Sequence, residues 1–467
     1  MDSLLATANQ IIWSWLLVYL LIGAGLWFTW HTGFVQFRRF GTLWSTIFAS
    51  RGGAKGGISS FQAFAVGLAS RVGTGNIAGV AIALTLGGPG AIFWMWCVAV
   101  LGMATAFVEA TLAQIFKVPQ PDGSFRGGPA YYIRTGLGSP GWGAVFAVLL
   151  IVTFGLAFNA VQANTIADVL QDAYGLSPLI TAVALAALAA PVFLGGVRAV
   201  ARVAEWLAPL MAAGYVLLAL VIVVLHADRV PEVLMLILRS AFGLEPAVAG
   251  ATGGMLAAML NGVRRGLFSN EAGMGSAPNA AATATVAHPV QQGFVQSLGV
   301  FIDTMVICSA TAFIILVSGL YDPTQPARIE GATLTQAVMA AEFGTAGLVF
   351  MSVAVFLFAF SSILGNYAYA ECNATFLSSR RVVLRVFRVL AIGAVLGGSL
   401  AELPLVWTLA DITMGLMALV NLVAILLLGR WAFGALADWE AAARHGTPEF
   451  RPVENPHLPA ALPTRAW

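Results

Sequence analysis

The chain has 467 residues, of which 59% are hydrophobic and 9% are charged, and its formal net charge is +2. Soluble globular domains carry about 25% charged residues, so this composition excludes an ordinary soluble protein. Apolar stretches of about 20 residues, the length that crosses a bilayer, recur along the chain. We therefore expect an all-α, multi-pass protein of the cell (inner) membrane, with the lipid bilayer around it and no nucleic-acid partner.

Eleven apolar stretches are expected to span the membrane. In chain order they cover 11–30, 60–86, 89–116, 142–170, 178–197, 203–226, 247–286, 292–320, 336–378, 383–401 and 404–429. The stretches that begin near 60, 247 and 336 are too long for one simple helix, so we expect broken, tilted or extended helices there. Residues 229–246 are too polar to span and predict an amphipathic helix on the outer surface.

The basic residues predict how these spans are oriented. With the N-terminus outside, the outer loops hold only Arg229, Arg239 and Arg328. Seventeen lysines and arginines then fall in cytoplasmic loops or the tail: Arg38, Arg39, Arg51, Lys55, Lys117, Arg126, Arg134, Arg198, Arg202, Arg380, Arg381, Arg385, Arg388, Arg430, Arg444, Arg451 and Arg465. Because cytoplasmic loops are enriched in lysine and arginine, we expect an outside N-terminus and a cytoplasmic C-terminus.

The spans divide into a leading helix and two sets of five. We expect an extra transmembrane helix with a cytoplasmic loop over 1–58, and a first five-helix repeat over 59–228. The outer amphipathic helix of 229–246 then leads to a second five-helix repeat over 247–430 and a loosely ordered cytoplasmic tail over 431–467. An odd number of spans in each set inverts the second set relative to the first.

Each set opens with a glycine-rich interruption, "SRVGTGN" (70–76) in the first and "LFSNEAGMGSAPN" (267–279) in the second. Interruptions at matching positions of two halves point to a transporter's binding site. A broken helix frees backbone groups that hydrocarbon cannot satisfy; free N–H groups near Thr74 suit a carboxylate, and the carbonyls before them suit sodium or an ammonium group. This pattern favours a zwitterionic amino acid coupled to a cation. The alternative is that Gly75 and Gly79 only allow close helix packing.

Four motifs resemble the alanine/glycine:cation (sodium:alanine) symporter family. They are "RVGTGNIAGVAIALTLGGPGAIFWMW" (71–96), "GGPAYYI" (127–133), "RRGLFSNEAGMGSAPNAAATA" (264–284) and "AFSSILGNYAYAE" (359–371). The resemblance implies a leucine-transporter (LeuT-type) fold, in which one extra helix precedes two inverted repeats of five helices and two helices are discontinuous at the binding site. It also implies sodium-driven uptake of small neutral amino acids such as alanine and glycine.

The resemblance also assigns site residues. The substrate would be held by Thr74, Gly75, Asn76, Gln162, Ile166, Phe268, Ser269, Met274, Gly275, Ser362 and Asn366. The coupling sodium ion would be held by the carbonyls of Ala69, Val72 and Phe358 and the hydroxyls of Ser361 and Ser362. Amides at Thr74 and Gly75 would take the substrate carboxylate, and the backbone from Phe268 to Gly275 would receive its ammonium group.

One position departs from the family pattern. Many members have tryptophan where this chain has Asn366, in "SSILGN". A tryptophan there would close the pocket around alanine or glycine, whereas asparagine is smaller and can form hydrogen bonds. We therefore predict that this pocket also accepts longer polar side chains, such as those of serine, asparagine or glutamine.

Other functions are less consistent with the sequence. It has no H-E-x-x-H or G-x-S-x-G motif and no nucleotide-binding loop, so we expect neither an enzyme nor an organic cofactor. Proton coupling on the same fold is the alternative, with Glu109, Glu271 and Asp303 as possible relays, although the serine pair at 361–362 favours sodium. Arg71 and Glu271 in the two broken segments would act in gating, hold the unwound backbone in shape, or form a buried ion pair that stabilises the crossing of the two segments. The oligomeric state is not predicted.

Overall fold

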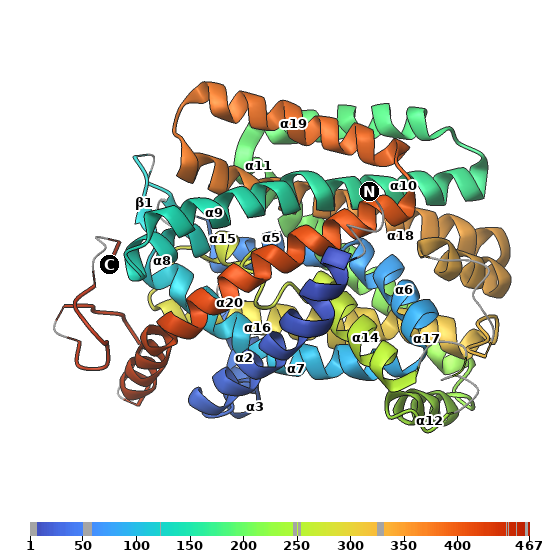
Figure 1. Cartoon of the computed structure of the whole chain (residues 1–467), viewed down its shortest axis with the longest axis horizontal. Helices are drawn as coiled ribbons and strands as arrows, with labels where there is room; N and C mark the ends of the chain where they lie inside the picture. The colour runs from blue at the N-terminus through green and yellow to red at the C-terminus, as the bar shows by residue number, and fades with distance from the viewer. Residues whose placement is uncertain are drawn as a thin grey trace.

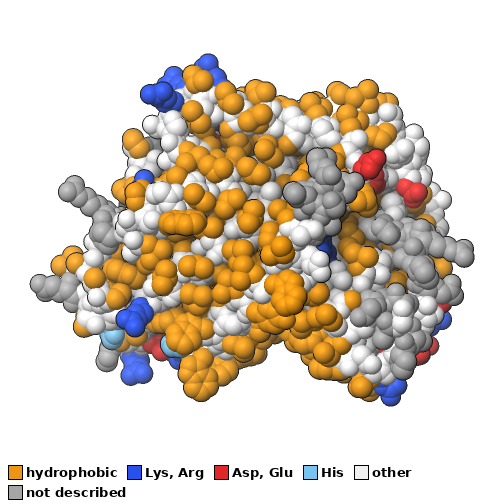
Figure 2. Space-filling model, in the orientation of Figure 1, with side chains coloured by type: hydrophobic (Ala, Val, Ile, Leu, Met, Phe, Trp, Pro, Cys, Tyr) orange, Lys and Arg blue, Asp and Glu red, His pale blue; other side chains and the backbone are white. Residues whose placement is uncertain are grey.

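The computed structural model describes residues 7–49, 58–121, 123–245, 250, 254–324, 331–444, 446, 448–453, 455–462 and 466–467. Within these ranges, eight helices are long and apolar enough to cross a membrane. Figure 2 shows apolar side chains over most of one face, with charged side chains mostly toward its edges. Exposed apolar residues include Trp206 at 79% and Leu210 at 73%, as expected where a helix contacts lipid. The expectation of an all-helical, multi-pass membrane protein is confirmed.

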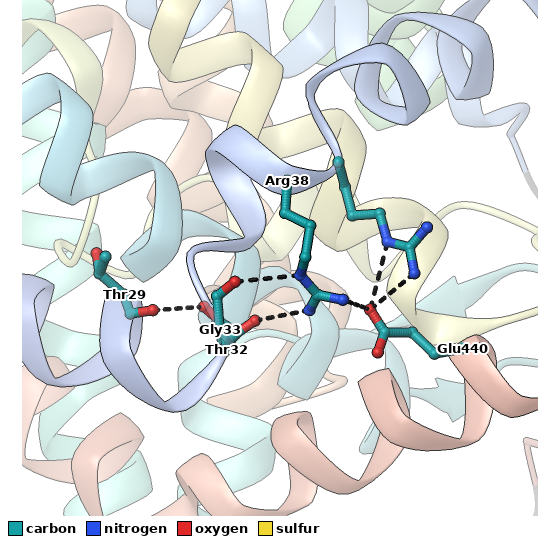
Figure 3. A network of polar contacts seen from close by, with 6 residues as sticks. Thr29, Thr32, Gly33, Arg38 and Glu440 are labelled. Atoms are coloured by element: carbon teal, nitrogen blue, oxygen red, sulfur yellow. Dashed lines mark hydrogen bonds and ion pairs between the residues drawn. The ribbon is translucent and has the colours of Figure 1, made fainter.

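The N-terminal segment packs on the last long helix. Its elements are η1 (Ile11–Leu17), a π-helical stretch, followed by α2 (Val18–His31), α3 (Val35–Arg38) and α4 (Phe40–Ala49). Figure 3 shows the side chain of Arg38 in α3 between the carbonyls of Thr32 and Gly33 and Glu440, which lies near the end of α20 (Leu403–Ala442). Nη1 of Arg38 lies 2.6 Å from Oε1 of Glu440, and Nη2 of Arg39 lies 3.1 Å from the same oxygen. The expected loop residues Arg51 and Lys55 lie outside the described ranges.

The first half of the chain contains one interrupted helix and several long ones. Its elements are α5 (Ser60–Arg71), η2 (Gly75–Gly79), α6 (Val80–Gly87), α7 (Gly90–Ile115), β1 (Val118–Pro119), β2 (Phe125–Arg126), α8 (Pro129–Gly136), α9 (Pro140–Leu150), η3 (Ile151–Phe158), α10 (Asn159–Tyr174) and α11 (Pro178–Leu225). β1 and β2 form an antiparallel hairpin. α5 begins with a capping box, in which the Ser59 hydroxyl accepts from the Gln62 amide.

The second half repeats the pattern of an interrupted helix followed by long ones. Its elements are α12 (Val230–Ala241), α14 (Gly254–Asn270), α15 (Pro278–Ala281), α16 (Pro289–Val300), η4 (Phe301–Cys308), α17 (Ser309–Ser318), α18 (Ala332–Leu377), α19 (Arg381–Leu400) and α20 (Leu403–Ala442). In Figure 1 the β1–β2 hairpin, α8 and the C-terminal tail lie at one end of the molecule, and α12 lies at the other.

Two of the longest helices bend at a glycine. α11 changes direction at Gly196 (φ +68°, ψ −166°), at the end of the span expected at 178–197 and before the span expected at 203–226. α18 bends at Gly344 (φ +61°, ψ −143°), which separates a short first segment from the segment that carries Ser361 and Ser362. Glycine adopts a positive φ without the steric cost that other residues have there, so each bend has a local cause.

The tail is more closely packed than its composition suggests. The amide of Phe450 donates to the carbonyl of Ala287 at 3.0 Å. Nε1 of Trp467 donates to the carbonyl of Gln114 at 3.0 Å, and the Lys117 ammonium lies 4.1 Å from the centre of the Trp467 ring. The described part of the tail therefore contacts the end of α7 and the segment before α16; Arg465 is outside the described residues.

Candidate functional site

The chain leaves helical geometry between α5 and η2. Val72 has φ −75° and ψ +82°, and a helical structure resumes at Gly75. The Gly73 N–H donates to Oδ1 of Asn76 at 2.9 Å, and the Thr74 N–H donates to Oε1 of Gln162 at 3.0 Å. The amide groups freed by this break are therefore paired with side-chain oxygens. An amide oxygen here occupies the position that a carboxylate oxygen would take if the same N–H groups bound an amino acid.

Two serines of α18 pack against the last carbonyls of α5. The Ser362 hydroxyl lies 3.0 Å from the carbonyl oxygen of Ala69 and 2.9 Å from that of Ser70. The Ser361 hydroxyl lies 3.3 Å from the carbonyl oxygen of Ala69 and 2.9 Å from that of Phe358. Four of the five oxygens expected to bind sodium are thus gathered at one point. Val72 is buried, and its N–H donates to the carbonyl of Leu68 at 2.8 Å.

The second break lies between α14 and α15. Glu271, Gly273 and Gly275 have φ values of +60°, +89° and +84°, which end the helix at Asn270. The Gly273 N–H donates to Oε1 of Glu109 at 3.2 Å, and its carbonyl accepts from Nδ2 of Asn421 at 2.9 Å. Nδ2 of Asn421 also lies 3.0 Å from Oε2 of Glu109. Buried side chains from α7 and α20 therefore replace the missing helical bonds of this segment.

Ser70 joins the two breaks to α18. Its hydroxyl lies 2.8 Å from Oε1 of Glu271 and 2.9 Å from Oδ1 of Asn366. The second carboxylate oxygen of Glu271 accepts from the Ser276 hydroxyl at 2.5 Å. The amide nitrogen of Asn366 is buried and has no hydrogen-bond partner within the described residues. Asn366 thus presents an unused donor beside the first break.

Asp303 of η4 also connects both breaks. Its carboxylate accepts from Nδ2 of Asn76 at 2.7 Å, from the Ser269 hydroxyl at 2.8 Å and from the Thr304 hydroxyl at 2.7 Å. Asp303 is fully buried, so these three donors meet the need of a buried carboxylate for hydrogen bonds. The sequence marked Asp303 only as a charge at membrane depth and a possible proton relay, because its contacts with Asn76 and Ser269 depend on how distant helices pack.

Aromatic side chains close the other side of this region. The Phe268 ring lies 4.5 Å from that of Phe158 and 4.6 Å from that of Trp407, measured between ring centres. A Cβ on Gly75 would lie 2.9 Å from the Phe268 ring and 3.2 Å from Cα of Ser269. Distances under about 3.0 Å require a shift, so glycine lets the first break approach α14 closely.

The structure does not bring every expected site residue to one point. Ile166 lies one turn after Gln162 on α10 and is buried. Met274 is buried in the second break, where its amide donates to the carbonyl of Glu271. The Cα of Gly275 faces Pro129 and Asn421, and its carbonyl accepts from Asn279. Gly275 therefore contacts α8 and α20, away from the Phe268 contact with Gly75.

Arg71 and Glu271 do not form a direct ion pair. Both residues are described, and no salt bridge within 4.0 Å joins them. Nη1 of Arg71 donates to the carbonyl of Gln296 at 3.3 Å, while Nε and Nη2 have no hydrogen-bond partner within the described residues. Glu271 instead uses the hydroxyls of Ser70 and Ser276. Of the expected roles, the direct ion pair is not present between these two described residues.

Known proteins resemble this chain over nearly its whole length. The profile of the sodium:alanine symporter family matches residues 1–452. The amino-acid carrier protein AlsT of Bacillus subtilis (strain 168) is 47% identical over 458 residues, covering 98% of this chain and 96% of AlsT. The probable sodium/glutamine symporter GlnT of the same strain is 45% identical over 449 residues, covering 96% and 92%.

A third relative shows a similar match. The sodium/alanine symporter AgcS of Methanococcus maripaludis is 37% identical over 433 residues, covering 91% of this chain and 94% of AgcS. These matches confirm the family expected from the motifs and the expectation of a transporter instead of an enzyme. The chain belongs to the sodium:alanine symporter family.

Proposed function

We propose that this protein carries small neutral amino acids into the cell together with sodium, by alternating access around the two helix breaks. One observation carries the proposal most directly. The hydroxyl of Ser70, at the end of α5, lies within hydrogen-bonding distance of both Glu271 in the second break and Asn366 on α18. Two interrupted helices and a serine-bearing helix thus meet where backbone polar groups are available to a zwitterion and a cation.

The fold that we propose has eleven transmembrane helices in a LeuT-type arrangement. The bend at Gly196 supports it, because it separates α11 into two segments of spanning length. The pairs α5–α6 and α14–α15 would each count as one discontinuous helix opening one of the two inverted repeats. The N-terminus would lie outside and the C-terminus in the cytoplasm, which places the β1–β2 hairpin, α8 and the tail at the cytoplasmic end.

The substrate carboxylate would bind the N–H groups of Thr74 and Gly75. Because the Thr74 N–H is paired with Gln162, the Gln162 side chain would turn to contact the substrate as the carboxylate takes its place. The carbonyls of Phe268 and Ser269 would receive the ammonium group. An anion at the N-terminal end of a helix is favoured by the free N–H groups and the helix dipole.

Sodium would bind between α5 and α18. The carbonyls of Ala69 and Phe358 and the hydroxyls of Ser361 and Ser362 already lie together, and hard uncharged oxygens suit an ion that must leave again. The hydroxyls would rotate so that their lone pairs face the ion. Proton coupling remains the second candidate, since Glu109, Glu271 and Asp303 are buried carboxylates near the two breaks.

The range of substrates would be set in part by Asn366. Its free amide nitrogen could donate to the side-chain oxygen of serine or glutamine, and the probable sodium/glutamine symporter GlnT is a 45% identical relative. Excess unlabelled glutamine should therefore slow the uptake of labelled alanine. A hundredfold excess without any effect would contradict this part of the proposal.

Transport in proteoliposomes tests the proposal. With an inward sodium gradient, labelled alanine should accumulate above its external concentration, which a channel cannot achieve. Replacing sodium with potassium should abolish accumulation, and a protonophore should leave it largely unchanged. Uptake that persists without sodium and collapses with the protonophore would establish proton coupling instead.

A further inference from the structure

A cavity lies one helical turn from the candidate site. Its volume is about 240 Å³, and its lining includes Val66 of α5, Thr283 just after α15, and Tyr369 and Glu371 of α18. Basic side chains also line it: Arg126, Arg198 and Arg388. These arginines belong to loops expected in the cytoplasm, so the cavity is on the proposed cytoplasmic side.

The same helix faces carry both the candidate site and the cavity. On α18, Ser362, Asn366 and Tyr369 follow one another at spacings of four and three residues, so they lie along one face. On α5, Val66 is four residues before Ser70 and lies on the Ser70 face. Three residues of helix correspond to about 4.5 Å along its axis. A molecule leaving the candidate site along these faces would therefore enter this cavity first.

Glu371 is the unusual side chain in the cavity. Its side chain is 7% exposed, and Oε1 lies 3.8 Å from Nη2 of Arg388, which is 24% exposed. Oε2 is buried and has no hydrogen-bond partner within the described residues. Buried carboxylates normally have their oxygens paired, so Oε2 of Glu371 lacks the hydrogen-bond donor that its burial calls for.

Arg388 also has a hydrogen-bond partner, which holds its guanidinium group away from a closer contact with Glu371. Its Nε donates to the Tyr367 hydroxyl at 3.0 Å, and that hydroxyl donates to the carbonyl of Phe193. Across the cavity, Arg126 donates to the Thr375 hydroxyl. The cavity thus offers a carboxylate with a free oxygen and guanidinium groups within one space, which are the two charges that match a zwitterion.

We propose that this cavity is a second, transient amino-acid site on the release path, in which Glu371 accepts the substrate ammonium group and Arg126 or Arg388 attracts its carboxylate. This inference rests on the proposed transport function. No bond is made or broken in this step. The ammonium group supplies the donor that Oε2 lacks, and the ion pair of 3.8 Å is loose enough to separate as the zwitterion enters.

The face of the membrane to which alanine is added distinguishes this site from the one at the helix breaks. Alanine transport is measured from the outside in intact cells and from the cytoplasmic face in inside-out vesicles. Glu371→Gln removes the charge but keeps the shape, so the half-saturating alanine concentration should rise about tenfold from the cytoplasmic face, as expected for losing a charge-assisted hydrogen bond. From the outside it should change less than twofold. Equal changes on both faces, or none, would overturn the proposal.

A matched control removes a different acid on the same helix. Glu342 lies near the other end of α18, where Oε1 is 3.5 Å from Nε2 of His226. Glu342→Gln should leave the cytoplasmic half-saturation unchanged. If it has the same effect as Glu371→Gln, charge loss anywhere on α18 is the cause and the proposal fails. If the unchanged protein shows no sodium-driven uptake of alanine, the proposed function is refuted. If the unchanged protein transports alanine but Glu371→Gln leaves the cytoplasmic half-saturating concentration unchanged, only this inference is refuted.

A labelling measurement in the otherwise unchanged chain does not depend on the folding of the Glu371 variant. Thr283 lines the cavity and is half-buried, so Thr283→Cys adds a thiol there beside the native Cys372, which is 3% exposed. Labelling of the parent chain gives the contribution of the native cysteines. Without sodium, alanine added to inside-out vesicles should slow maleimide labelling of this thiol, and propionate, which lacks the ammonium group, should not. Labelling that alanine leaves unchanged, or that propionate slows equally, would contradict a site for the ammonium group.

Discussion

The closest approach between the first break and α18 is at Gly73. A Cβ at this position would lie 2.2 Å from Oγ of Ser362 and 3.1 Å from Oε1 of Gln162. Gly73→Ala therefore forces Ser362 out of its place, where its hydroxyl lies 3.0 Å from the carbonyl oxygen of Ala69 and 2.9 Å from that of Ser70. Overpacking of this kind costs about 1–3 kcal/mol.

If the overpacking in Gly73→Ala displaces the Ser362 hydroxyl from the sodium site, its free-energy cost lowers the affinity for sodium. About 1–3 kcal/mol corresponds to a roughly 5- to 150-fold rise in the sodium concentration that half-saturates alanine uptake. Gly79→Ala is the matched control, because the nearest atoms to a Cβ there are 3.9 Å away. Uptake is measured against sodium concentration in proteoliposomes for both variants. Should the two variants show the same sodium dependence, the close contact between Gly73 and Ser362 has no part in sodium binding.

Three further outcomes are expected. Asn366→Trp should fill the space beside Ser70, so glutamine should no longer compete with labelled alanine while glycine still competes. Arg265→Met should lower the free energy of unfolding, by at most about 3–5 kcal/mol, since it removes the nearer of the two arginines that pair with the buried Asp411 carboxylate and leaves Arg264, whose Nη1 lies 3.6 Å from Oδ2 of Asp411; thermal unfolding in detergent measures this. Burial lowers the pKa of Lys117, just beyond α7, to about 7. Because the unfolded chain then binds more protons between pH 7 and about 10, the free energy of unfolding should rise with pH by at most about 1.4 kcal/mol per unit, and Lys117→Met should flatten that rise.

The two helix breaks could be predicted because their cause is local. Glycine and polar residues inside an apolar stretch weaken a helix where backbone groups need partners, and the structure leaves helical geometry at Val72 and again from Glu271 to Gly275. The amphipathic segment was also visible in the sequence, and α12 (Val230–Ala241) forms within it. The packing of α12 was not visible in the sequence, because it depends on α7, where Nε1 of Trp94 donates to the carbonyl of Ala241 at the end of α12.

The partners of the freed backbone groups could not be predicted from one sequence. Gln162 and Asn421 reach the breaks from helices that are distant along the chain. Which way a residue faces is also undefined where the helical period is lost, so the packing of Gly275 against Pro129 and Asn421 could not be predicted. The bend of α11 depends on a single backbone angle at Gly196, which the composition of the span does not determine.

Coupled binding tests the central claim most directly, because the substrate and the ion are proposed to share the backbone of one broken helix. Alanine binding to the purified protein is measured by calorimetry in sodium and in choline buffer, for the parent chain and for Ser362→Ala. We predict tight binding in sodium, at least tenfold weaker binding in choline, and loss of most of that difference in the variant. Equal affinity in the two buffers, or a sodium effect that survives intact in Ser362→Ala, would contradict the account.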